Sequence, residues 1–245
     1  MTDLDTPNLA SKWRRITLAI GLPFLAAALL FAFRDINALV LPHWFRWVLA
    51  TPLLAAFVIF TQRSWSVFLP AGGTPRDRLA FYESQLVKYS PLGGVAQTAS
   101  QVLTLPGERE ERSRIVRKVL VSKLAAACGG LLWSPVLAVL GDFSLPIRTL
   151  LIILGGTSLA VHPVVLRRLC TMAGRVRPSF DFSAEIPNGA LIFRSVTIAA
   201  AGVGSAGAGF AVLAGTDQGG VVEFVAAIAG FALAWSLAFL SLIHI

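Results

Sequence analysis

The chain has 245 residues, of which 56 % are hydrophobic and only 14 % charged, and its mean hydropathy is +0.72. This composition excludes an ordinary soluble domain and is typical of a polytopic membrane protein. The formal net charge of +8 does not indicate nucleic-acid binding, because the Lys and Arg residues fall in loops and at the ends of apolar runs.

Six apolar runs predict six transmembrane helices. Residues 1–12 are polar and are expected to form a cytoplasmic tail, and residues 13–245 are expected to form a single integral membrane domain. The runs cover residues 16–33, 47–62, 124–141, 149–166, 195–216 and 224–245. The second run reaches spanning length when Trp44 and Arg46 are included. The predicted fold is therefore all-α, a polytopic membrane helix bundle of about six transmembrane helices.

Residues 89–107 form a seventh uncharged segment, which is broken and polar. It opens with Pro91, Gly93 and Gly94 and carries Gln97 and Gln101 on one helical face. At membrane depth such backbone is tolerated only where it is buried in protein or lines a wet cavity. With the helical pattern that precedes it, this segment predicts a re-entrant helical hairpin over about 77–105.

Two alternatives remain for this region. The first arm, residues 76–89, also has the pattern of an amphipathic helix lying on the lipid headgroups. The polar stripe of the second arm also fits simple hydrogen bonding between packed helices.

The positive charges favour a hairpin over a seventh span. If the segment returns to the cytoplasmic side, the basic groups at 12–15, 63–88, 109–123 and 167–177 all lie on the inner face. If it crosses, the last two groups move outside, which violates the positive-inside rule. The N-terminus is then cytoplasmic and the basic groups attract anionic headgroups.

Several single residues have a structural interpretation beside a functional one. Cys128 and Cys170 are too few and too dispersed for a disulfide or metal framework, so we interpret them as packing residues. His162 is interpreted as a boundary histidine before Pro163, which is expected to break the helix near the inner face. Arg194 either snorkels to the inner headgroups or meets a phosphate or Glu83 in a cavity.

Four sequence elements resemble the integral membrane region of the lysylphosphatidylglycerol synthase/flippase family. They are a Trp after the second span, a polar element ending in a Lys-Tyr-x-Pro-Gly-like motif, a basic loop before a small-residue span, and a His-Pro followed by arginines. The matching residues are Trp65, Gln85, Lys88, Tyr89, Pro91, Gly93, Gly94, His162, Pro163, Arg167 and Arg168. The similarity covers roughly residues 13–240, with one residue inserted between Pro91 and Gly93.

The resemblance implies movement of a lipid or lipid-linked headgroup across the cytoplasmic membrane. Larger members carry a soluble aminoacyl-transfer domain, which is not implied for these residues. Members also continue beyond the last span, whereas this sequence stops at LSLIHI. We therefore expect a C-terminally truncated sequence whose last six residues are artefactual.

The leading hypothesis is a flippase-like protein for an anionic or polyprenyl-linked (glyco)lipid, with no cofactor. Its expected binding residues are Glu83, Gln85, Lys88, Tyr89, Pro91, Gly93, Gly94, Gln97, Gln101 and Arg194. The alternative is a non-catalytic membrane scaffold that docks an envelope glycosyltransferase or lipid-modifying enzyme. Neither an H-E-x-x-H nor a G-x-S-x-G motif occurs, so an enzyme with a catalytic or metal site is not predicted.

Overall fold

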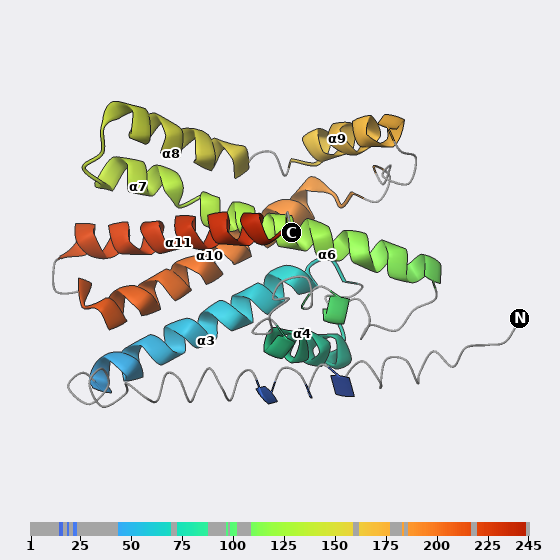
Figure 1. Cartoon of the computed structure of the whole chain (residues 1–245), viewed down its shortest axis with the longest axis horizontal. Coiled ribbons are helices and arrows are strands. Elements are labelled where there is room, and N and C mark those ends of the chain that lie inside the picture. The colour runs from blue at the N-terminus through green and yellow to red at the C-terminus, as the bar shows by residue number, and fades with distance from the viewer. Residues whose placement is uncertain are drawn as a thin grey trace, which may run out of the picture. The chain divides into compact units, whose positions relative to one another are not determined.

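The computed structural model describes residues 15–16, 19, 22–23, 44–69, 73–87, 97, 99–101, 109–158, 162–176, 183, 186–216 and 220–243. All regular structure in these residues is helical, which confirms the all-α prediction for the described part (Figure 1). The helices are α3 (Trp44–Ser66), α4 (Pro75–Val87), α6 (Arg109–Leu131), α7 (Ser134–Leu140), α8 (Leu145–Thr157), α9 (Pro163–Val176), α10 (Gly189–Ala214) and α11 (Val221–Ile243).

Four helical segments are long and apolar enough to cross a membrane: Trp44–Ser66, Lys118–Leu140, Gly189–Ala214 and Val221–Ala238. The chain is therefore a helical membrane protein. The predicted first span, residues 16–33, lies mostly outside the described residues.

The chain divides into two compact units. The first consists of Met1–His43, Leu69–Leu120 and Leu242–Ile245, and the second of Trp44–Phe68 and Val121–Ser241. The second unit contains most of the spanning helices, and we call it the bundle.

In the bundle, α3 lies antiparallel to α10. A Cβ on Gly209 would lie 3.1 Å from Leu54, and one on Gly202 would lie 2.9 Å from Phe60. Sequence numbers thus rise along α3 as they fall along α10. The small residues on α10 leave room for the α3 side chains, which brings the two helices close together.

Other glycines of α10 face other helices. A Cβ on Gly204 would collide with the Trp133 ring at the α6–α7 junction, and one on Gly207 would lie 2.9 Å from the Ile228 carbonyl oxygen of α11. The sequence GVGSAGAG, residues 202–209, thus allows other helices to approach closely. Its glycines serve three neighbouring helices rather than one.

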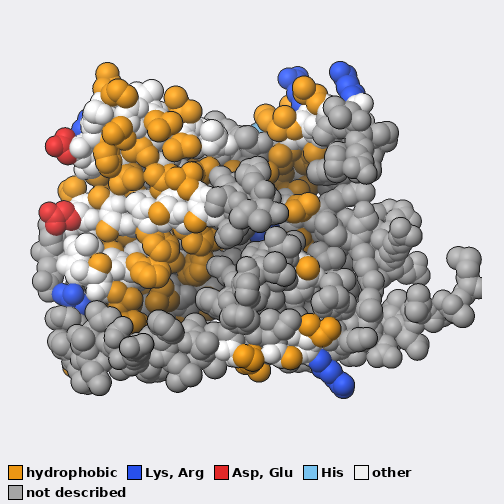
Figure 2. Space-filling view, viewed as in Figure 1, with side chains coloured by type: hydrophobic (Ala, Val, Ile, Leu, Met, Phe, Trp, Pro, Cys, Tyr) orange, Lys and Arg blue, Asp and Glu red, His pale blue; other side chains and the backbone are white. Residues whose placement is uncertain are grey.

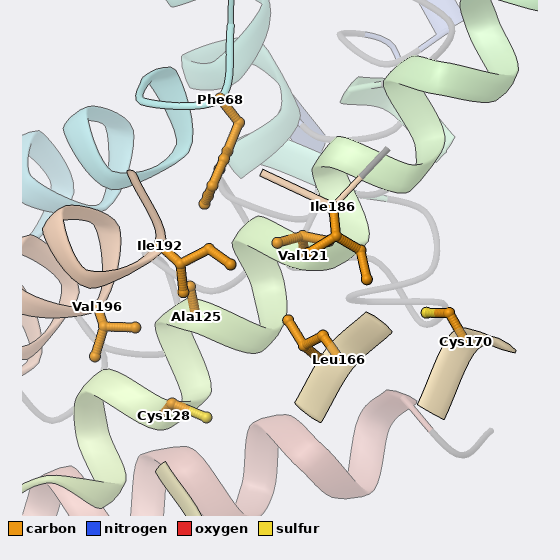
Figure 3. Packing of buried hydrophobic residues seen from close by; sticks show 9 residues of the cluster. All are labelled: Phe68, Val121, Ala125, Cys128, Leu166, Cys170, Ile186, Ile192 and Val196. Atoms are coloured by element: carbon orange, nitrogen blue, oxygen red, sulfur yellow. The ribbon is translucent and has the colours of Figure 1, made fainter. Parts of the chain in front are cut away.

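One end of the bundle holds a core to which five segments contribute. Figure 3 shows α6 in the middle of this core, with Phe68 and the start of α10 on one side and α9 on the other. Its buried residues are Phe68, Val121, Ala125, Cys128, Leu166, Cys170, Ile186, Ile192 and Val196. The two cysteines are buried packing residues, as the sequence predicted.

The predicted span over residues 149–166 is not one helix. α8 ends at Thr157, where the Ser158 N–H bonds to the carbonyls of Gly155 and Gly156, and a separate helix, α9, begins at Pro163. Proline lacks an N–H but fits the first turn of a helix, so Pro163 opens α9 rather than ending the preceding helix. Residues 167–176, which follow the predicted span, are thus helical as well.

α8 alone is too short to cross the bilayer. Its 13 residues extend about 20 Å, against a hydrocarbon core of roughly 30 Å. It packs on α7, where the buried Ser134 hydroxyl donates to the Leu151 carbonyl oxygen at 2.8 Å.

α10 begins six residues earlier than predicted. The Asn188 side chain accepts a hydrogen bond from the Leu191 N–H at 2.9 Å, which caps the helix at its start. Arg194 is therefore in the second turn of a capped helix. At the other end Gly215, with φ 79°, ends α10 in the left-handed conformation that glycine favours.

Gly129 provides a test of the close approach between α6 and α10. A Cβ there would lie 2.7 Å from the Ala200 backbone nitrogen and 2.9 Å from the Val196 carbonyl oxygen. Backbone cannot move aside as a side chain can, so we expect Gly129→Ala to lower the free energy of unfolding by about 1–3 kcal/mol. SDS-induced unfolding in mixed micelles measures this change.

The matched control is Gly230→Ala in the interior of α11, where a Cβ would meet nothing within 4 Å. There the higher helix propensity of alanine should leave stability unchanged or raise it by up to about 1 kcal/mol. Equal destabilisation by both substitutions would contradict the packing.

Ser64 and Ser195 join α3 to α10 through reciprocal hydrogen bonds. The hydroxyl oxygens lie 2.8 Å apart, and each hydroxyl also lies within 3.0–3.1 Å of the other residue's carbonyl oxygen. Both residues are buried. Replacing either by alanine should cost about 0.6–1.7 kcal/mol of stability, the range for interhelical hydrogen bonds in membranes.

The double variant should cost less than the sum of the two single variants, because each single change already removes the shared bond. Ser205→Ala is the control, since in the part of the chain that the structure describes the Ser205 hydroxyl bonds back to the Ala201 carbonyl of its own helix. Strict additivity of Ser64→Ala and Ser195→Ala would count against the pairing.

Candidate functional site

The first helix of the candidate site, α4, is fixed at its start by a capping arrangement. Thr74 precedes Pro75, and its hydroxyl accepts a hydrogen bond from the Asp77 N–H at 3.2 Å. In return an Asp77 carboxylate oxygen accepts from the Thr74 N–H at 2.6 Å. This reciprocal pattern satisfies two backbone donors at the helix start, where Pro75 also fits well.

α4 is buried on one side and exposed on the other. Phe81, Glu83 and Ser84 are buried, whereas Leu79 and Tyr82 are exposed. The exposed apolar side chains suit a helix in contact with lipid.

The second arm presents its polar residues to α4. Gln97, Ser100 and Gln101 are helical and buried, with Gln101 fully inaccessible. The Gln101 amide nitrogen donates to the Ser84 hydroxyl oxygen at 3.1 Å, and that hydroxyl donates to the Phe81 carbonyl oxygen at 2.6 Å. The structure thus brings together two arms whose linked residues are 17 positions apart.

We call this group of buried residues the polar cluster; its members are Glu83, Ser84, Gln97, Ser100 and Gln101. It offers amide and hydroxyl groups that both donate and accept hydrogen bonds, together with one carboxyl group. Buried polar groups are costly unless they are satisfied, and within membrane proteins they often mark sites that bind polar ligands. Its chemistry suits hydroxyl-bearing or amide-bearing groups.

The other predicted site residues fall in three places. Lys88, Tyr89, Pro91, Gly93 and Gly94 lie outside the described residues. Gln85 is half-buried on α4, and its Nε2 atom has no hydrogen-bond partner within the described part of the chain. Arg194 is exposed on α10 of the bundle, a position that fits the snorkelling interpretation.

The position of His162 fits its interpretation as a boundary histidine. It is exposed at the start of α9, where its Nδ1 atom faces the Val164 N–H at 3.4 Å and its carbonyl oxygen accepts from Leu166. Among the described residues, no group of three or more His, Cys, Asp or Glu side chains is arranged to hold a metal ion.

Ser84 was not predicted as a site residue. A signal for it exists in the sequence, because Ala80 and Ser84 are four apart and form a small-residue stripe on α4. Such a stripe allows a second helix to approach closely. Ser100 was not predicted as a site residue either.

No protein-family model, no curated protein and no solved structure matches the chain. The resemblance to the lysylphosphatidylglycerol synthase/flippase family therefore rests on the quoted residues alone.

Ser84→Ala tests the contact between the two arms. It removes the acceptor for Gln101, which should weaken the contact by about 1 kcal/mol. We expect the backbone amides of α4 to exchange hydrogen roughly fivefold faster, as measured by mass spectrometry on the protein in nanodiscs.

Ser236→Ala is a matched control. Ser236 is also fully buried, but its hydroxyl has no hydrogen-bond partner among the residues the structure describes. The change should leave exchange in α4 unaltered. If Ser84→Ala were equally silent, Gln101 and Ser84 would not be bonded in the membrane.

Proposed function

We propose that this chain is a flippase-like protein that moves an anionic or polyprenyl-linked lipid across the cytoplasmic membrane. The observation that carries the proposal is the polar cluster, buried in a segment that leaves the bundle and rejoins it at the same end. The N-terminus is taken to be cytoplasmic.

The direction of the bundle helices supports a re-entrant path for this segment. α3 runs antiparallel to α10. α6 runs parallel to α10, because Trp133, which follows Gly129 in the sequence, also contacts later residues of α10 than Gly129 does. α3 and α6 therefore run in opposite directions. Phe68, just after α3, and Val121, in α6, belong to the same core.

A chain that exits and re-enters at one end of a spanning bundle crosses the membrane an even number of times in between. Residues 69–120 contain the polar stripe, and their only uncharged stretch of spanning length is 89–107. Two full crossings need two such stretches. A hairpin that enters and returns by the same face is the simpler solution, and it agrees with the positive-inside distribution.

Lipid translocation needs polar groups at this place. A headgroup entering hydrocarbon loses its hydration, and each unpaired polar group then costs several kcal/mol. Neutral amides and hydroxyls such as those of Gln101 and Ser84 replace part of that hydration without themselves adding a buried charge. Lys88, at the end of the first arm, is the proposed partner for the lipid phosphate.

The family resemblance points the same way, since its members move lipids or lipid-linked headgroups. The aminoacyl-transfer activity of its larger members is not part of the proposal.

A reconstituted transport assay tests the proposal. We expect the purified protein in liposomes to accelerate the movement of fluorescent phosphatidylglycerol or of a short-chain polyprenyl phosphate between leaflets. Glu83→Leu and Gln101→Leu should each slow this movement about tenfold or more, because they remove hydrogen-bonding capacity from the polar cluster. Lys88→Ala should slow it for these anionic lipids and not for phosphatidylcholine.

Ser236→Ala is again the control and should transport at the unaltered rate. Two results would overturn the proposal: translocation no faster than in empty liposomes, or equal rates for all variants. A scaffold would instead show no transport, and charge reversal at residues 109–118 would abolish its copurification with an envelope glycosyltransferase.

A further inference from the structure

α9 carries exposed features that the transport proposal does not use. Two of its residues, Leu166 and Cys170, hold it in the bundle core, where they are 9 % and 8 % exposed. Val165, Leu169 and Met172 are apolar but 39 %, 53 % and 61 % exposed. The helix is therefore anchored along one stripe and leaves a second apolar stripe uncovered.

The exposed apolar residues share one side of the helix. Val165, Leu169 and Met172 follow one another at spacings of four and three, so they form a continuous stripe next to the buried one. Large side chains exposed in this pattern indicate contact with lipid or with another molecule.

The next side of the same helix is cationic. Arg168 and Arg175 are seven residues apart and share a stripe, and Arg167 lies further round; all three are exposed. α9 contains no acidic residue, and Val164 is the one exposed apolar residue on the arginine side. Figure 2 shows both apolar and basic side chains on the visible surface of α9.

The position of α9 identifies the surface that it faces. Its anchor residues contact the core at the end of the bundle where α3 ends and α10 begins. This end also receives the basic groups of the sequence, so it corresponds to the inner leaflet. That leaflet carries anionic lipids and a surface potential of about −30 mV.

We propose that α9 is an in-plane interfacial helix that binds the anionic headgroups of the inner leaflet. Val165, Leu169 and Met172 insert at the boundary between headgroups and acyl chains. Arg167, Arg168 and Arg175 contact lipid phosphates. The three stripes (core, acyl boundary and headgroup) follow the order around the helix that this orientation requires. The inference is independent of whether the protein moves lipids.

Depth measurements on the full-length protein in nanodiscs test the orientation. Met172→Cys and Arg168→Cys variants are spin-labelled one at a time; Cys128 and Cys170 are both buried, which favours selective labelling. We expect the label at 172 to be accessible to oxygen and shielded from a water-soluble nickel complex, and the label at 168 to show the reverse. Equal exposure of both labels to the nickel complex would overturn the proposal, and it would do so also if a protein partner, rather than lipid, binds α9.

Lipid preference tests the charge. A fluorophore is attached to the introduced thiol of the Met172→Cys variant. Energy transfer from this fluorophore to headgroup-labelled phosphatidylglycerol or phosphatidylcholine then measures how far each lipid is enriched near α9. At low ionic strength phosphatidylglycerol should be enriched, and each change of Arg167, Arg168 or Arg175 to Gln should reduce its preference up to about fivefold. Raising the salt concentration should reduce it as well.

Arg148→Gln is the control. Arg148 is an exposed arginine near the start of α8, and its guanidinium lies 3.4 Å from the Gly141 carbonyl oxygen. This substitution should leave the preference unchanged. No enrichment in the unsubstituted helix, or equal effects of Arg148→Gln and Arg168→Gln, would refute anionic-lipid binding.

Discussion

The close approach of helices around α10 is the constraint on which the bundle depends. In a bilayer the lipid tails are as apolar as leucine, so burying apolar surface between helices gains little. Association relies instead on dense packing and on hydrogen bonds between helices. Gly129 of α6 and Gly207 of α10 meet this requirement, because a Cβ at either position would lie 2.7–2.9 Å from the backbone of the facing helix.

Hydrogen bonds then fix the position of each helix along its neighbour, which packing alone does not determine. The Trp133 indole donates to the Ala200 carbonyl oxygen at 3.0 Å, and Ser64 and Ser195 bond to one another on the other side of α10. These contacts determine the directions of α3 and α6 relative to α10. The directions in turn determine that residues 69–120 start and finish at one end of the bundle, so the packing of α10 bears directly on the proposed hairpin.

Hydropathy predicted the parts of the fold that depend on composition. Four predicted spans correspond to long apolar helices, because uncharged stretches of this length have few other stable places. The same reasoning failed for residues 149–166, where local chemistry decides the outcome: α8 ends beside the Gly155–Gly156 pair and α9 starts at Pro163. The mean hydropathy of a stretch of residues does not reveal either of these local signals.

The sequence predicted only part of the candidate site. Gln97 and Gln101 were recognisable as a polar stripe because two amides four residues apart are unusual in a spanning segment. The Ser64–Ser195 contact joins residues 131 positions apart, and one sequence contains no information on such a pairing.

The buried polar residues of the bundle are distributed unevenly, and this bears on how a lipid path would work. Several lie within about two helical turns of Phe68, Val121 or Ile192, namely Gln62, Ser64, Ser66, Ser122 and Ser195. The opposite half of α10 is lined by Gly207, Gly209 and Ala211, and the buried Arg46 lies beside Gly215 at its end. Polar side chains lower the cost of a dehydrated headgroup, and small apolar ones do not. If the chain moves lipids as proposed, a headgroup beside the outer half of α10 meets small apolar residues before it reaches Arg46, and crossing this part requires helices around α10 to separate at the contacts that hold them together.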